Sequence, residues 1–248
     1  MAYGFTCINE SGFYQIDGTL PQLMEVASGS ATVSSYSDMV SGGGSRQQII
    51  SLSSVFGNRD IFIFIKPNTE SGVKSCGVWK YKVGSQWRFW FWSNNFPANE
   101  TIKYAIFVSG STAAANTGYG LNVFTASGDV GYSSERINIR ATQAAMGVMS
   151  KSTSVGPLHQ SSMAGVFGLY TGTNFVERFF NGPSSFNPNT DSMGEEGYEI
   201  NWYHSHLTFD YYAKTITMSA GSYYSGQTNY FVDKGGSSTR TLITGTRI

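Results

Sequence analysis

The run Trp87-Arg88-Phe89-Trp90-Phe91-Trp92 indicates the fold class more directly than any other part of the sequence. Aromatic residues favour the pleated surface of a sheet, and the side chains of an extended strand point alternately to its two faces. The first, third and fifth residues of the run therefore share one face, and the other three share the opposite face. Such a strand is either buried on both faces or offers aromatic rings to a ligand on one of them.

The composition of the whole chain also favours strands. Aromatic residues make up 15% of the 248 residues and there are 29 glycines, whereas charged residues reach only 13%, about half the usual share. Long runs of Ala, Leu, Glu, Lys and Arg, which helices prefer, are scarce. We therefore expect an all-β protein with Gly-rich turns.

The charge and the hydropathy of the sequence argue against nucleic-acid binding and against a membrane span. The chain has 16 basic and 16 acidic residues and a formal net charge of zero, so it lacks the positive surface of a nucleic-acid-binding protein. No apolar run approaches the ~20 residues of a membrane span. The first residues lack the charged and apolar regions of a signal peptide, so we expect synthesis in the cytosol.

A ten-residue motif occurs twice, at residues 3–12 and 119–128, with a constant offset of 116 residues. Each copy has the pattern of a β-hairpin: a short strand with alternating apolar residues, a turn ending in glycine, and a returning strand. We expect two equivalent hairpins from an internal duplication, with chance similarity of β-rich sequence as the alternative. The identical positions are Tyr3, Gly4, Ser11 and Gly12 in the first copy and Tyr119, Gly120, Ser127 and Gly128 in the second.

Strand-like segments separated by Gly-rich turns continue through both halves of the chain, and this pattern predicts β-sandwiches. Residues 109–117 are small and polar and are typical of a linker. We therefore predict two β-sandwich-like modules, at residues 1–112 and 113–248. The second module is expected to carry a long surface loop near residues 181–196, which are rich in Gly, Pro, Asn and Ser.

The cysteines and histidines do not form a recognisable metal site. Cys7 and Cys76 are expected to be two buried thiols, with a disulfide between them as the less favoured alternative in a reducing compartment. His204 and His206 share one strand face and are the weak candidates for a metal site, because in a three-fold assembly such pairs supply six nitrogens to one ion. Within one chain, only Asp210 and Glu199 are available as a third ligand. The default expectation is therefore no metal.

Catalytic constellations are scarce. His159 has no neighbouring acid, and no Gly-x-Ser-x-Gly turn is present. Glu195, Glu196 and Glu199 lie near Asp191 and offer carboxylates for glycoside hydrolysis, but the simpler interpretation is the solvated rim of a loop. Gly42-Gly43-Gly44 lacks the lysine of a phosphate-binding loop. We expect neither catalytic nor cofactor-binding residues.

Exposed aromatic residues remain as candidates for binding. Sugar-binding modules stack apolar sugar faces on flat rings, whereas core and subunit-interface packing is the more common use of such residues. The candidates for an interface or a stacking platform are Trp87, Trp90, Trp92, Tyr223 and Tyr224.

The segment Ala2–Gly12, followed by Gln15–Thr19, resembles a small family of bacteriophage and prophage tail proteins. Its members begin with an aromatic-Gly-apolar strand, an Asn-x-Ser-Gly turn and a returning strand. The second copy, Tyr119–Ser134, is similar to the internal motif of that family, and the resemblance covers residues 1–25 and 103–140. The resemblance implies a virion component of the tail tip or tail fibre and no catalytic residues.

These observations predict a structural protein of a phage tail, made in the host cytoplasm and incorporated into the virion. We expect it to form a homo-oligomer, with a trimer favoured, and to bind other tail proteins. A module that binds a host cell-surface receptor or glycan is the first alternative, and a glycan depolymerase is the second.

Overall fold

The computed structural model describes strands and turns only. The prediction of an all-β protein is confirmed for the described part of the chain, which contains no helix and therefore no helix able to cross a membrane. The described residues are 6–8, 14–17, 23–32, 49–52, 60–94, 101–109, 120–125, 128, 130–134, 137, 139–149, 153–169, 175–179, 198–228 and 238–247.

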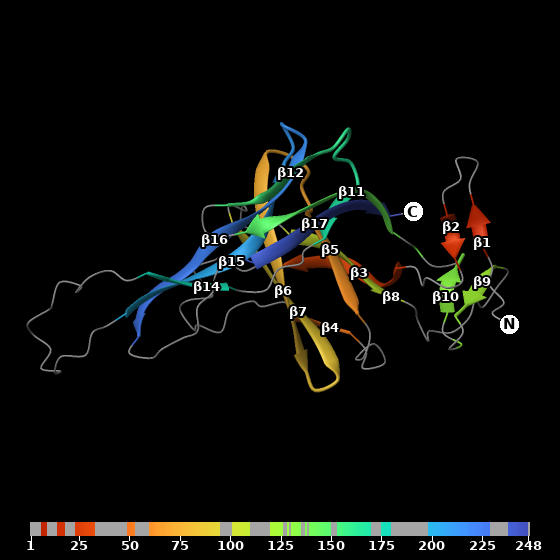
Figure 1. The fold of residues 1–248 in the computed structure, drawn as a ribbon, viewed down its shortest axis with the longest axis horizontal. Coiled ribbons are helices and arrows are strands. Elements are labelled where there is room, and N and C mark those ends of the chain that lie inside the picture. Colours follow the sequence, from red (N-terminus) through yellow and green to blue (C-terminus); the bar gives the residue numbers. More distant parts are fainter. Residues whose placement is uncertain are drawn as a thin grey trace, which may run out of the picture.

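Two antiparallel sheets form the body of the molecule (Figure 1). The six-stranded sheet has the order β11 (Ile139–Met149), β17 (Ser238–Arg247), β13 (Val166–Leu169), β5 (Ile61–Pro67), β8 (Thr101–Ser109) and β3 (Leu23–Thr32). The seven-stranded sheet has the order β12 (Val155–His159), β16 (Thr215–Thr228), β15 (Tyr198–Asp210), β6 (Val73–Val83), β7 (Gln86–Asn94) and β4 (Ile49–Ser51), with β14 (Phe175–Phe179) paired to β15.

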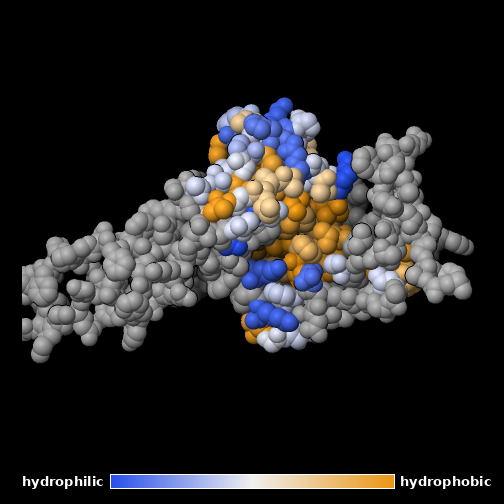
Figure 2. Space-filling model, viewed as in Figure 1, coloured by the Kyte–Doolittle hydropathy of each residue, from blue (hydrophilic) through white to orange (hydrophobic). Residues whose placement is uncertain are grey.

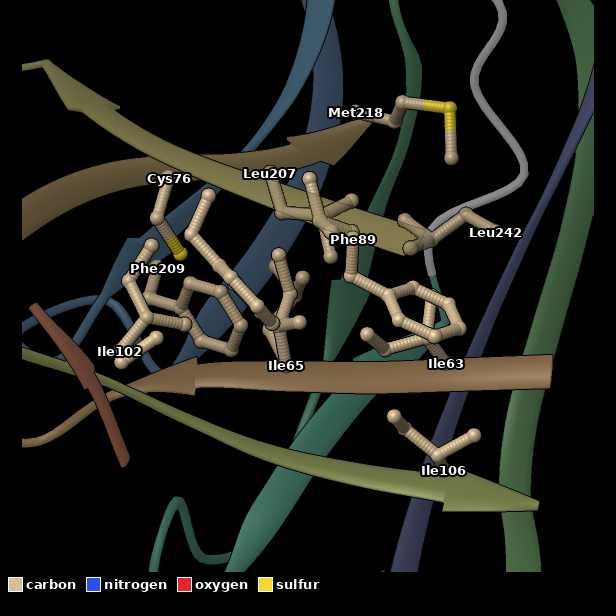
Figure 3. Close-up of a cluster of buried hydrophobic side chains, with 14 of the residues drawn as sticks. Ile63, Ile65, Cys76, Phe89, Ile102, Ile106, Leu207, Phe209, Met218 and Leu242 are labelled. Carbon is tan, nitrogen blue, oxygen red and sulfur yellow. The ribbon is translucent and has the colours of Figure 1, made fainter. Parts of the chain in front are cut away.

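The main core lies between the two sheets. Ile63 and Ile65 of β5 point toward Leu207 and Phe209 of β15, and Phe89 of β7 completes this layer (Figure 3). All five side chains are at most 2% exposed. Every second side chain of these central strands enters the space between the sheets, so the apolar residues at alternate positions form the core of a sandwich.

The division into two successive modules is wrong for the described strands. In the six-stranded sheet, β13 pairs with β5, and in the seven-stranded sheet, β15 pairs with β6. Both sheets therefore contain strands from residues 1–112 and from residues 113–248, and they form one sandwich. Neighbouring strands along the sequence pair often but not always, and composition does not reveal the pairs that are distant in sequence.

The two hairpins predicted from the repeat are present. β1 (Thr6–Ile8) pairs with β2 (Tyr14–Asp17), and β9 (Asn122–Phe124) pairs with β10 (Val130–Ser133). Adding 116 to each residue number of the first hairpin gives the bounds, the register and the bulge of the second. Both hairpins lie at the same end of the molecule (Figure 1). The duplication thus extends from the sequence motif to backbone pairing.

Within the repeat motif, the structure describes only Gly120 and Gly128. Gly128 has a φ of 81°, the left-handed conformation expected for the glycine that ends the turn. The other six motif residues lie outside the described residues, as do residues 110–117 of the expected linker and the expected loop at residues 181–196. Ser109, the first residue of the expected linker, ends β8.

Residues 141–149 and 155–159 belong to strands that the sequence pattern did not reveal. β11 lies at an edge of its sheet, and most of its side chains are exposed on both faces. Met149 of β11 is buried in the main core and Ala145 packs against it, whereas the apolar Met146 and Val148 between them are exposed. The strand therefore lacks the alternation of apolar and polar residues by which a half-buried strand is recognised.

A buried polar network joins β11 to the segment after β12. β11 contains a bulge between Ala141 and Gln143, which leaves Thr142 outside the ladder. Thr142 and Thr244 share a hydrogen bond of 2.8 Å between their hydroxyl oxygens, and the side-chain amide of Gln160 donates to Thr244 Oγ1 at 2.9 Å. Thr244 is fully buried and Gln160 is nearly so, so these bonds satisfy groups that water does not reach.

Gly168 of β13 lies where the opposite sheet approaches the backbone closely. A Cβ atom at this position would lie 2.6 Å from Cδ1 of Leu207, which is fully buried and surrounded by other core residues. A side chain at residue 168 would therefore force the two sheets apart or move Leu207 off its rotamer.

The substitution Gly168→Ala is expected to lower the free energy of unfolding by about 1–3 kcal/mol, because it overfills the core. Equilibrium denaturation in urea measures the change. Gly147→Ala is the matched control, since its Cβ would make only an ordinary contact of 3.5 Å with Val155. Adding Leu207→Val to Gly168→Ala should restore part of the loss through coupling of the two sites. Equal losses in the two glycine variants would contradict this account.

The substitution Thr244→Val is expected to destabilise the protein by about 1–3 kcal/mol, because it removes a buried hydroxyl that bonds both Thr142 and the Gln160 amide. Gln143 Oε1, at 3.2 Å, is then the acceptor that remains for this amide. Thr239→Val, at an exposed position of the same strand, should change stability by less than about 0.5 kcal/mol. Thermal and urea denaturation of both variants provide the measurement. A neutral effect of Thr244→Val would show that the network does not stabilise the corner of the sandwich.

Candidate functional site

The aromatic run at residues 87–92 lies in β7, between β6 and β4. Phe89 and Phe91 are buried in the main core and Trp87 packs against it, so the face formed by the first, third and fifth residues is a core face. For Trp90 and Trp92 the structure describes the backbone alone, which pairs with Trp79 and Gly77 of β6.

Trp87 lies beneath two ammonium groups. Lys80 Nζ lies 5.3 Å and Lys82 Nζ 5.6 Å from the centroid of its ring, within the range of cation–π attraction. Lys80 also donates a hydrogen bond of 2.9 Å to the carbonyl of Ile61. Desolvation lowers the pKa of Lys80, and nearby Asp60 acts in the opposite direction. These contacts give Trp87 a role in packing and in holding lysines, and they occupy a ring that a stacked sugar would need.

The tyrosine candidates lie at a bulge in β16. Trp202 pairs with Tyr224 and Tyr203 pairs with Ser222, so Tyr223 is the residue left out of the ladder. The side chains of Tyr223 and Tyr224 lie outside the described residues. Their role at an interface or as a stacking platform remains a prediction.

The weak metal candidates lie on β15. His206 is buried and stands opposite Ser219, whereas the backbone of His204 stands opposite Gly221. Asp210, suggested as a further ligand, accepts hydrogen bonds from the backbone N–H groups of Tyr212 and Ala213 and so closes the turn after β15. The described residues contain no group of three or more His, Cys, Asp and Glu side chains arranged to hold a metal.

Of the other chemically reactive residues, His159 is exposed at the end of β12 and pairs with Thr215. Cys76 is a fully buried thiol in the main core, as predicted. Asp191, Glu195 and Glu196 lie outside the described residues, and so do the side chains of Glu199 and Cys7.

The six-stranded sheet curls until its two edge strands meet at one end. The N–H of Glu25 in β3 donates to the carbonyl of Ile137, just before β11, at 2.9 Å. The guanidinium of Arg247, at the end of β17, contacts the Glu25 carboxylate at 2.7 Å. Leu23 of β3 and Ile139 of β11 both pack against a second apolar cluster, on the face turned away from the main core. This second cluster consists of Phe64, Ala105, Phe107, Phe167 and Leu169.

A basic pocket lies on the same face as the second cluster. Its volume is about 390 Å³, and it is open to solvent. Lys66 of β5, Lys103 of β8 and Arg247 of β17 line it, together with Phe167, Gly165 and Thr246. The three cations come from positions 66, 103 and 247, so no local motif reveals the pocket. Only the pairing of their strands brings them together.

Strand pairing sets two of these cations side by side. Lys66 stands directly opposite Lys103 in the ladder between β5 and β8, an arrangement that is unfavourable for like charges. Lys66 forms an ion pair with Glu70, and its ammonium group lies 5.2 Å from the centroid of the Phe167 ring. Lys103 makes no ion pair with any described residue, so its charge faces the pocket without compensation.

Exposed apolar side chains gather at two further places. Leu121, Phe124 and Ile137 lie in or near the β9–β10 hairpin, and each is at least 40% exposed. Met146 and Val148 lie on the edge strand β11 and are 75% and 56% exposed. Figure 2 shows other hydrophobic side chains at the surface over the middle of the molecule, bordered by hydrophilic ones. Exposed groups of this kind are typical of surfaces that contact other proteins.

No family model, curated protein or solved structure matches the chain.

Proposed function

We propose that this protein is a non-enzymatic structural component of a bacteriophage tail, in the tip or fibre region, and that it assembles with other tail proteins. The observation that carries the proposal is the pair of matching hairpins at one end of the molecule. These hairpins are formed by the two segments that resemble phage tail proteins. Their common register supports a repeated docking element.

The exposed side chains near the second hairpin support a role in assembly. Phe124 is 54% exposed on β9, and Leu121 and Ile137 are 44% and 40% exposed beside it. Each buries additional apolar area if a partner covers this end, at roughly 25 cal/mol per Å². A hairpin end with several apolar side chains suits a contact with a protein better than a catalytic site.

The edge strand β11 offers a second contact surface. Its inner edge is paired with β17 over ten residue pairs, and its side chains Met146 and Val148 face solvent. Open edges of this length readily pair with another chain unless they are protected. A homo-oligomer, with a trimer favoured, and contacts with neighbouring tail proteins would cover such an edge. Host attachment is compatible with this position in the virion.

Replacing Phe124 and Ile137 together by Ser is expected to reduce incorporation into phage particles by about tenfold or more, since truncating a hot-spot residue at the centre of an interface costs about 2 kcal/mol or more of binding. Quantitative mass spectrometry of purified particles, with antibody labelling in electron micrographs, provides the measurement. The melting temperature should stay nearly unchanged, because both side chains are exposed.

Tyr212→Ser is the matched control, because Tyr212 is 82% exposed in the turn between β15 and β16. This variant should be incorporated normally. Absence of the unaltered protein from purified particles would refute the proposed location. Normal incorporation of the double variant would refute the hairpin end as the docking surface.

A further inference from the structure

The basic pocket has more donors than the protein uses. The described contacts of Arg247 engage its Nη2 with Glu25, out of five N–H donors in the guanidinium group. The ammonium group of Lys66 donates to Glu70, and that of Lys103 donates to no described residue. These unused donors converge on one open space of about 390 Å³. Convergent charged donors without protein acceptors are the basis of an anion site.

The charge of the pocket selects the class of anion. Lys66, Lys103 and Arg247 bring three positive charges, and the carboxylates of Glu70 and Glu25 offset two of them. One positive charge remains, which matches a carboxylate better than a phosphate dianion. Glu25 also holds the Arg247 guanidinium in place, and its own carboxylate is only 9% exposed, so the arginine is preorganised for a planar carboxylate.

The remaining walls leave room for a ligand that carries a ring as well as a carboxylate. Ala164 and Gly165, with the small exposed part of Phe167, give one part of the wall an apolar character, whereas Thr246 and the lysines make the other part polar. Gly165, with a φ of 68°, adds no side chain, and the space beside it is open. Sites for small polar molecules combine an apolar wall with a few charged groups in this way, and the volume lies within their usual range.

We propose that this pocket binds a sugar carboxylate, namely a hexuronic acid residue of an acidic polysaccharide. Arg247 contacts the carboxylate, Lys103 supplies the uncompensated charge, and the sugar ring lies against the wall formed by Ala164 and Gly165. The site depends on the curl of the six-stranded sheet and not on assembly into a particle. Its binding can therefore be tested separately from the proposed role in the tail.

The test is a titration of the purified full chain, followed by protein NMR at low ionic strength, with sodium glucuronate as the probe. Glucose, acetate and inorganic phosphate are titrated in parallel. Glucuronate should give saturable shifts at residues of β5, β8 and β17, and it should bind more tightly than acetate or phosphate, whereas glucose should give none. Lys103→Gln should weaken glucuronate binding by about tenfold or more, as expected for loss of a hydrogen bond to a charged group.

Stability distinguishes a binding role of Lys103 from a purely structural one. Because Lys103 stands opposite Lys66, Lys103→Gln should raise the melting temperature by about 1–3 °C while binding is lost. Lys82→Gln, at an exposed lysine of the other sheet, should leave glucuronate binding unchanged. The proposal is overturned if glucuronate gives no saturable shifts or if Lys103→Gln binds it normally. It is also overturned if acetate or phosphate binds more tightly than glucuronate.

Discussion

Antiparallel pairing between strands from opposite halves of the chain holds the rest of this structure in place. β13 pairs with β5 at the centre of one sheet, and β15 pairs with β6 at the centre of the other. The core side chains of these central strands meet between the sheets, where Gly168 allows Leu207 to approach the backbone. If these long-range pairs did not form, neither half would have a complete sheet to bury its apolar face.

The curl of the six-stranded sheet follows from the same pairing and creates a second environment. Once β3 and β11 meet through Glu25 and Ile137, the face turned away from the main core becomes an enclosed surface with its own apolar cluster. The period of two along each strand places Lys66 on the same face as Phe64, and Lys103 on the same face as Phe107. A charged pocket thus arises at the margin of an apolar cluster without a local binding motif.

The two surfaces suggested here as functional differ in physical character. The hairpin end presents exposed apolar side chains on short, duplicated strands, which suits contacts with a protein surface. The pocket presents cations from three strands of one sheet that are distant from one another in the sequence, and this arrangement suits a small anionic group. A tail protein that both assembles and attaches would use surfaces of these two kinds.

From the sequence alone, the strand-rich class, the two hairpins with their common offset and the division of residues 87–92 between two strand faces could be predicted. These features depend on residues close together in the chain, through alternation and turn chemistry. The single sandwich, the exposed strand β11 and the basic pocket could not be predicted, because they depend on which distant strands become neighbours and on the register between them. A shift of one residue between β5 and β8 would move Lys66 from opposite Lys103, so only the tertiary structure decided where these charges meet.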